Sequence, residues 1–194
     1  MDSPEQTEST KQKQAPLIGV VLAGGLSRRM GEDKALLPFQ DSTLLHHQVE
    51  LLKPLCDHVL VSGDYAGFAC VPDTVARCGP LGGIYSVALN NPGANLLVIA
   101  VDMPLLTTQH LRVLMNCPQT CFIEGHPLPA MFRQSESLLV AINGIFEDSA
   151  PNFSIRHLHQ ILNSSALQFA EFNGLNINNP EQWQDFNLSL NKRV

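Results

Sequence analysis

The alternation of short apolar runs with longer amphipathic segments is the feature that most limits how this chain can fold. The apolar runs lie at 17–22, 58–62, 96–101, 121–123 and 130–132, and each has the length of a buried strand. The amphipathic segments at 44–52, 84–89, 107–115, 137–146 and 155–162 have helical spacing. Strands that alternate with helices form βα units. The pattern therefore predicts an α/β fold with a mostly parallel sheet and helices on both faces.

Length and composition limit the domain organisation. A chain of 194 residues with 44% hydrophobic and 15% charged residues suits one folded domain and argues against disorder. Residues 1–15 are polar and show no hydrophobic periodicity, so we expect a flexible N-terminal leader, with one domain over 16–194. The longest apolar run, 96–101, is far shorter than the roughly 20 residues that span a bilayer. We therefore expect no membrane association.

Charge and cysteine content limit the classes of binding partner and indicate the cellular compartment. The net charge of −6 comes from 12 cationic and 18 acidic side chains, which argues against binding a nucleic-acid polymer. An acidic chain can still hold a small phosphorylated ligand where backbone amides and a few cations converge. The five cysteines are odd in number and show no C-x-x-C spacing, which is typical of free thiols in a reducing cytoplasm.

A glycine-rich loop follows the first predicted strand. Gly24 and Gly25 permit close approach of the backbone, so its N–H groups can point at phosphate oxygens. Arg28, Arg29 and Lys34 add three cations, which suits a polyphosphate. The loop matches neither the Walker pattern G-x-x-x-x-G-K-S/T nor the dinucleotide fingerprint G-x-G-x-x-G. A tight turn with solvated cations is the structural alternative.

Two further segments follow strands and should reach the same edge of the sheet. Asp102 comes directly after the run at 96–101, where a buried carboxylate needs a partner, and Mg²⁺ is the natural one. A helix cap or turn would be the ordinary role. Asp73 could accept from a guanine edge or a ribose hydroxyl, and Gly82 leaves room for a flat base or sugar. Taken alone, that segment would be an ordinary loop and helix start.

Four motifs in this order resemble the bacterial molybdenum cofactor guanylyltransferase family. They are LAGGLSRRMGEDKALL at 22–37, GPLGGI at 79–84, VDMP at 101–104 and NINNPEQ at 176–182. The resemblance covers residues 17 to about 187 and implies a Rossmann-like nucleotidyltransferase domain. It also implies Mg²⁺-dependent transfer of GMP from GTP to molybdenum-bound molybdopterin, with release of pyrophosphate. Cofactor-loading proteins and molybdoenzyme chaperones are the partners expected for this family.

The resemblance also implies roles for individual residues. Leu22, Ala23, Gly24 and Asp73 would contact the nucleotide, and we add Gly25 and Gly82 to this set. Lys34 would contact the phosphates, and Asp102 would bind both GTP and Mg²⁺. Arg28 or Arg29 would stabilise the leaving pyrophosphate together with Lys34. Asn176 and Asn178 would lie on the pterin side. Ser62 stands where the family often has an asparagine that contacts the nucleotide, which leaves base selectivity open.

Two other functions are compatible with parts of the sequence. One is cytidylyl or other nucleotidyl transfer to a pterin or sugar phosphate, although the related cytidylyltransferase pattern tends toward LAAG and lacks the GPLGG form found here. The other is a non-catalytic protein that hands the cofactor to apoenzymes. Such a protein would tolerate loss of Lys34 or Asp102, and both are present.

Overall fold

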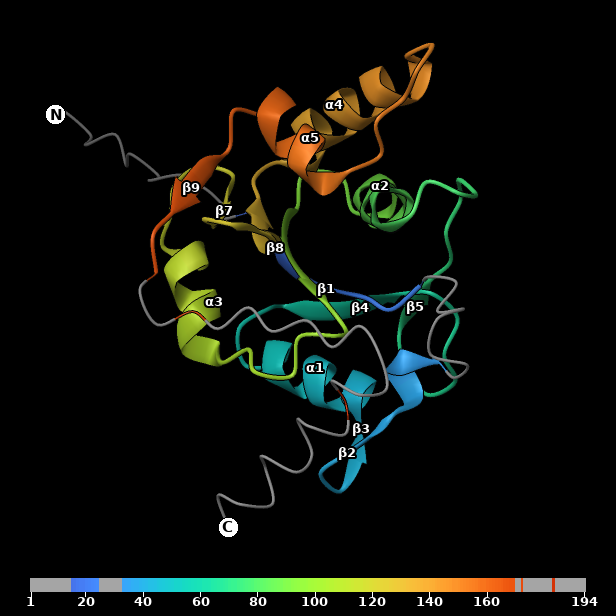
Figure 1. The fold of residues 1–194 in the computed structure, drawn as a ribbon, viewed down its shortest axis with the longest axis vertical. Coiled ribbons are helices and arrows are strands. Elements are labelled where there is room, and N and C mark those ends of the chain that lie inside the picture. Colours follow the sequence, from blue (N-terminus) through green and yellow to red (C-terminus); the bar gives the residue numbers. More distant parts are fainter. Residues whose placement is uncertain (1–14, 25–32, 170–171, 173–182, 184–194) are drawn as a thin grey trace, which may run out of the picture.

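The computed structural model describes residues 15–24, 33–169, 172 and 183. In this part of the chain, seven strands form one sheet in the order β5-β4-β1-β6-β8-β7-β9 (Figure 1). β1 pairs in parallel with β4 and β6, β4 with β5, and β7 with β9, whereas β8 runs antiparallel to β6 and β7. The sheet is therefore mostly parallel, as predicted. The strands are β1 (Leu17–Leu22), β4 (His58–Ser62), β5 (Cys70–Val71), β6 (Asn95–Ala100), β7 (Cys121–Ile123), β8 (His126–Phe132) and β9 (Ser165–Leu167).

Helices cover both faces of this sheet and make the three layers (Figure 1). On one face lie α1 (Leu44–Leu52) and α3 (Thr108–Met115), and on the other lie α2 (Pro80–Asn90), α4 (Ser135–Glu147) and α5 (Ile155–Ile161). A short 3-10 helix, η1 (Lys34–Leu36), and a small hairpin of β2 (Pro38–Phe39) and β3 (Ser42–Thr43) precede α1. In the described residues, no helix has the length and apolarity needed to cross a membrane.

The central strands are buried on both sides, which explains their apolar sequences. In β6, Leu96 and Val98 pack into the core beneath α2 and α4, while Leu97 and Ile99 pack into the core beneath α1 and α3. All four side chains are fully buried. Alternate residues of a strand point to opposite faces, so a strand that lies between two helical layers needs an apolar residue at every position.

Local signals set most helix ends. Thr107 caps α3, as the sequence suggests, and its hydroxyl accepts a hydrogen bond from the His110 amide. At α1 the cap is Thr43, whose hydroxyl accepts from the His46 amide at 3.2 Å. α2 begins at Pro80, so the segment at 79–83 opens the helix, as expected. Proline suits the first position of a helix because its missing N–H would have no partner there.

Candidate active site

Three neighbouring strands end together at one edge of the sheet. Leu22, the last residue of β1, pairs with Ser62 at the end of β4 and with Ala100 at the end of β6. The chain then crosses to opposite sides of β1, with α1 on one face and α2 on the other (Figure 1). Such a switch point at the carboxyl ends of parallel strands opens the crevice where α/β proteins bind ligands.

Ser62 holds the start of the glycine-rich loop at this edge. Its carbonyl oxygen accepts hydrogen bonds from the amides of Ala23, at 3.2 Å, and Gly24, at 2.8 Å. Its side chain is buried, and the hydroxyl donates to Oδ1 of Asp73 at 3.0 Å. The structure therefore engages the Ser62 hydroxyl with Asp73. Direct contact of Ser62 with a nucleotide stays a prediction.

The glycines face Asp73 across a narrow space. A methyl group added to Gly24 would lie 3.8 Å from Oδ2 of Asp73, and one on Gly82 would lie 3.9 Å from the same oxygen. The loop that carries Asp73 is tied to α2, because the Thr74 amide donates to the Ser86 hydroxyl at 2.9 Å. Oδ2 of Asp73 thus lies close to two positions that have no side chain.

Lys34 and Asp102 meet at the same edge. The Lys34 Nζ lies 3.4 Å from Oδ2 of Asp102, and their side chains are only 15% and 17% exposed. Oδ1 of Asp102 is buried and has no hydrogen-bond partner among the described residues. Burial raises the pKa of the Asp102 carboxyl above its usual range, although the Lys34 ammonium acts in the opposite direction.

A divalent cation fits this arrangement. An ionised carboxylate oxygen that is buried without a partner is costly, and a bound cation would remove that cost. Within the described ranges, no group of three or more His, Cys, Asp and Glu side chains could hold a metal ion. Mg²⁺ does not require such a group, because one or two carboxylates and the phosphates of a substrate commonly hold it. Asp102 is the residue that would hold it here.

The sequence motifs do not identify two residues that support this edge. Gln48, in the middle of α1, is fully buried and donates from Nε2 to the Met103 carbonyl oxygen at 2.8 Å, which ties the turn after Asp102 to α1. Tyr65 lies in the loop after β4, and its hydroxyl donates to the Ala23 carbonyl oxygen at 3.0 Å. Position after a strand could have drawn attention to Tyr65. Nothing in the helical pattern around Gln48 distinguishes it.

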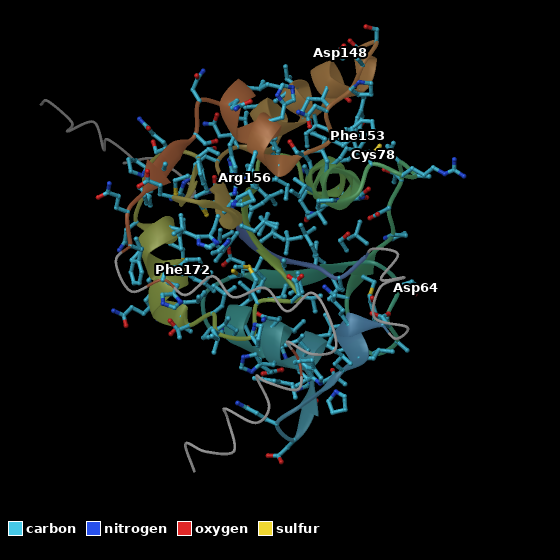
Figure 2. The ribbon with its side chains drawn as sticks, viewed as in Figure 1. Asp64, Cys78, Asp148, Phe153, Arg156 and Phe172 are labelled. Carbon is cyan, nitrogen blue, oxygen red and sulfur yellow. The ribbon has the colours of Figure 1, made fainter. Side chains whose placement is uncertain are left out.

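The predicted residues that the structure describes share this edge. Leu22, Ala23, Gly24, Ser62, Asp73 and Gly82 form one group, and Lys34 and Asp102 form a second beside it. Figure 2 shows Asp64 and Cys78, which lie just after β4 and just before α2, on the same side of the molecule. A cavity of about 570 Å³ lies elsewhere, beside His46 and His58 at the amino end of β4. Gly25, Arg28, Arg29, Asn176 and Asn178 lie outside the described residues.

Comparisons with known proteins show the family to which the chain belongs. Residues 19–148 match the model of the MobA-like NTP transferase domain. Over 179 residues, the chain is 40% identical to a molybdenum cofactor guanylyltransferase of Xanthomonas euvesicatoria pv. vesicatoria. This alignment covers 88% of this chain and 94% of that protein. A probable molybdenum cofactor guanylyltransferase of Flavobacterium johnsoniae is 29% identical over 192 residues, covering 90% of this chain and 98% of the relative.

A solved structure confirms the fold. The molybdopterin-guanine dinucleotide biosynthesis protein A of Archaeoglobus fulgidus superposes with a TM-score of 0.71 at 18% identity, over 90% of this chain and 99% of that one. The similarity to the Xanthomonas protein extends beyond the segment that the domain model matches. The chain therefore belongs to the MobA-like NTP transferase family and, within it, to the molybdenum cofactor guanylyltransferases.

Proposed function

We propose that this protein transfers GMP from GTP to molybdenum-bound molybdopterin, which forms the molybdopterin guanine dinucleotide cofactor and releases pyrophosphate. The observation that carries this proposal is the meeting of Lys34 and Asp102, 3.4 Å apart, beside the glycines and Asp73 at one sheet edge. A polyphosphate needs a cation and backbone amides close together. The names of the relatives supply the identity of the two substrates.

In this reaction the terminal phosphate of molybdopterin attacks the α-phosphorus of GTP. A new phosphorus–oxygen bond forms, the bond between the α-phosphorus and the bridging oxygen breaks, and pyrophosphate leaves. The nucleophile is already an anion, so the protein needs no general base. Catalysis then depends on positioning and on charge neutralisation.

The residues at the edge divide these tasks. Lys34, with Arg28 or Arg29, would stabilise the charge that develops on pyrophosphate. Asp73 would accept from the guanine edge or a ribose hydroxyl, with the base lying against Gly24 and Gly82. Nucleotidyltransferases of this family generally use a divalent metal, and we propose Mg²⁺ held by Asp102. When bound, the ion neutralises phosphate charge.

The acceptor would lie toward β8. β8 runs antiparallel to β6, so it begins at the edge where β6 ends. Beside this start, the His126 ring packs against Phe172 with centroids 5.0 Å apart. We propose that Asn176 and Asn178 act on the pterin side, as the sequence motif implies. Cofactor-loading proteins and molybdoenzyme chaperones are the proposed partners. All five cysteines are free thiols, which supports action in the cytoplasm.

The test is a transfer assay with purified protein, molybdenum-bearing molybdopterin, Mg²⁺ and either GTP or CTP. We expect pyrophosphate and the guanine dinucleotide with GTP, and a large loss of turnover in Lys34→Ala. Product with CTP alone would overturn the guanylyl assignment. Product with neither nucleotide would favour a handover protein. If Lys34→Ala changes only the KM for molybdopterin, the role assigned to Lys34 is wrong.

A further inference from the structure

The hydroxyl of Tyr65 connects the two described ends of the glycine-rich loop. It lies 3.0 Å from the Ala23 carbonyl oxygen, before the loop, and 3.0 Å from Oδ2 of Asp33, after it. Both groups are acceptors, and they share the single hydroxyl proton. Burial, followed by the hydrogen bond to Asp33, raises the pKa of Tyr65, so the hydroxyl keeps that proton at neutral pH.

The tyrosine is itself firmly placed. The turn between β4 and β5, which Asp64 marks in Figure 2, carries it beside the site. Its amide donates to Sγ of Cys70 at 3.3 Å, and that thiol donates back to the Tyr65 carbonyl oxygen at 3.4 Å. Gly63 has a φ of +140°, and a Cβ there would lie 2.7 Å from Cε2 of the Tyr65 ring. A side chain at position 63 would therefore displace the ring.

The contact with Asp33 leads on to Lys34 and Asp102. Oδ1 of Asp33 accepts from the Ala35 amide at 3.0 Å and so caps η1. Lys34 is the first residue of η1, and its ammonium lies 3.4 Å from Asp102. On the other side, Ala23 is tied to β4 through the Ser62 carbonyl oxygen. The hydroxyl thus connects the fixed end of β1 to the residue that precedes Lys34.

We propose that Tyr65 is a positioning residue for nucleotide transfer, because its hydroxyl joins Ala23 to Asp33 and thereby holds Lys34 where the triphosphate binds. It does not touch the reacting atoms, and it acts through Lys34. The inference rests on the proposed function. It adds a residue that the sequence motifs do not include and assigns it to the GTP side of the reaction.

The first test compares Tyr65→Phe with Tyr85→Phe. Both changes remove one hydroxyl, but Tyr85 lies in α2 with its ring against Phe146, 5.1 Å away. Losing a hydrogen bond that positions Lys34 should lower kcat/KM for GTP by about 5- to 10-fold in Tyr65→Phe. The KM for molybdopterin and the melting temperature should stay close to those of the wild type. Tyr85→Phe should change none of these values by more than about two-fold.

A double-mutant cycle tests the route through Lys34. If Tyr65 acts by placing Lys34, then adding Tyr65→Phe to Lys34→Ala should cost less than about two-fold further. Isothermal calorimetry of Mg²⁺–GTP binding gives the same comparison without turnover. An unchanged kcat/KM in Tyr65→Phe, or the same loss in both backgrounds, would overturn the inference. If the wild type binds GTP but transfers nothing, the proposed function fails instead, and calorimetry still decides the role of Tyr65.

Discussion

At the scale of single residues, Asp102 shows how a site can be costly to the fold and useful to the reaction. One carboxylate oxygen faces Lys34, and the other is buried without a partner among the described residues. Burial raises the pKa, so ionisation is harder in the folded chain than in the unfolded one. The ionised form that would bind a cation is therefore the form that the fold disfavours.

Asp102→Asn should separate these two effects. The wild-type carboxylate leaves stability intact below the ordinary pKa of about 3.9 and reduces it as the pH rises through the raised pKa. The neutral amide has no such dependence. At pH 7 without metal, Asp102→Asn should therefore melt at a higher temperature than the wild type, and the difference should shrink near pH 4. Its kcat should fall by at least about 100-fold.

Thermal melts at both pH values, with a chelator present, check the stability. The exposed Asp41→Asn is the control, and it should melt like the wild type at pH 7, because surface substitutions usually change stability little. A melting temperature below that of the wild type at pH 7 would contradict the assigned cost of burial. Added Mg²⁺ and GTP should raise the melting temperature of the wild type more than that of Asp102→Asn.

At the scale of elements, the site depends on how closely α2 approaches the ends of β1 and β4. A Cβ on Gly83 would lie 2.1 Å from Oγ of Ser62 and 3.2 Å from Cδ2 of Leu22. One on Gly82 would lie 3.0 Å from the Val75 carbonyl oxygen. The first turn of α2 therefore packs against the strands through its backbone, and this packing places the Asp73 loop.

Gly83→Ala and Gly144→Ala make the same chemical change in two helices with different surroundings. In α2, the new methyl group must push Ser62 away from Asp73, so we expect a loss of about 1–3 kcal/mol in the free energy of unfolding. In α4, a Cβ on Gly144 meets nothing within 4 Å, and alanine should stabilise the helix by up to about 1 kcal/mol. Urea unfolding measures both. Equal effects at the two positions would show that the close approach of α2 does not matter.

The elements were predictable from sequence to the extent that their signals are local. Hydrophobic periodicity and caps predict the five helices of the described residues to within a few positions, and apolar runs predict the central strands. β8 begins at His126, earlier than the predicted 130, because Ile123 of β7 pairs with His126 across an irregularity in the register. Gln48 contacts Met103 across 55 positions of the chain, and Tyr65 contacts Ala23 across 42. No local pattern reports such pairs, so the supporting residues of the site came only from the structure.

At the scale of the whole molecule, different polar side chains support the carboxyl edge of the sheet on its two faces. The face beneath α1 and α3 carries Gln48, which supports the turn after Asp102. On the other face, His159 of α5 is buried between two phenylalanine rings. Its ring centroid lies 4.2 Å from that of Phe122 and 5.4 Å from that of Phe132. Its ring nitrogens contact the Ser164 hydroxyl and the Pro127 carbonyl oxygen, both at 3.0 Å. A neutral imidazole thus joins α5 to the start of β8.

This imidazole should make the stability of the protein sensitive to mild acid. Burial, with a smaller effect of the Arg156 guanidinium, lowers the pKa of His159, while the Pro127 carbonyl acts in the opposite direction. A base whose pKa is lowered in the fold contributes its full stability above the unfolded value of about 6.5 and loses it as the pH falls toward the folded value. The melting temperature of the wild type should therefore decrease between pH 7 and pH 5.

The melting temperature of His159→Gln should be lower than that of the wild type at pH 7, because the variant loses ring packing, but it should fall less steeply as the pH decreases. His47, whose pKa burial also lowers, keeps part of the slope in that variant. A His159→Gln profile parallel to that of the wild type would show that protonation of His159 does not unfold this side of the sheet.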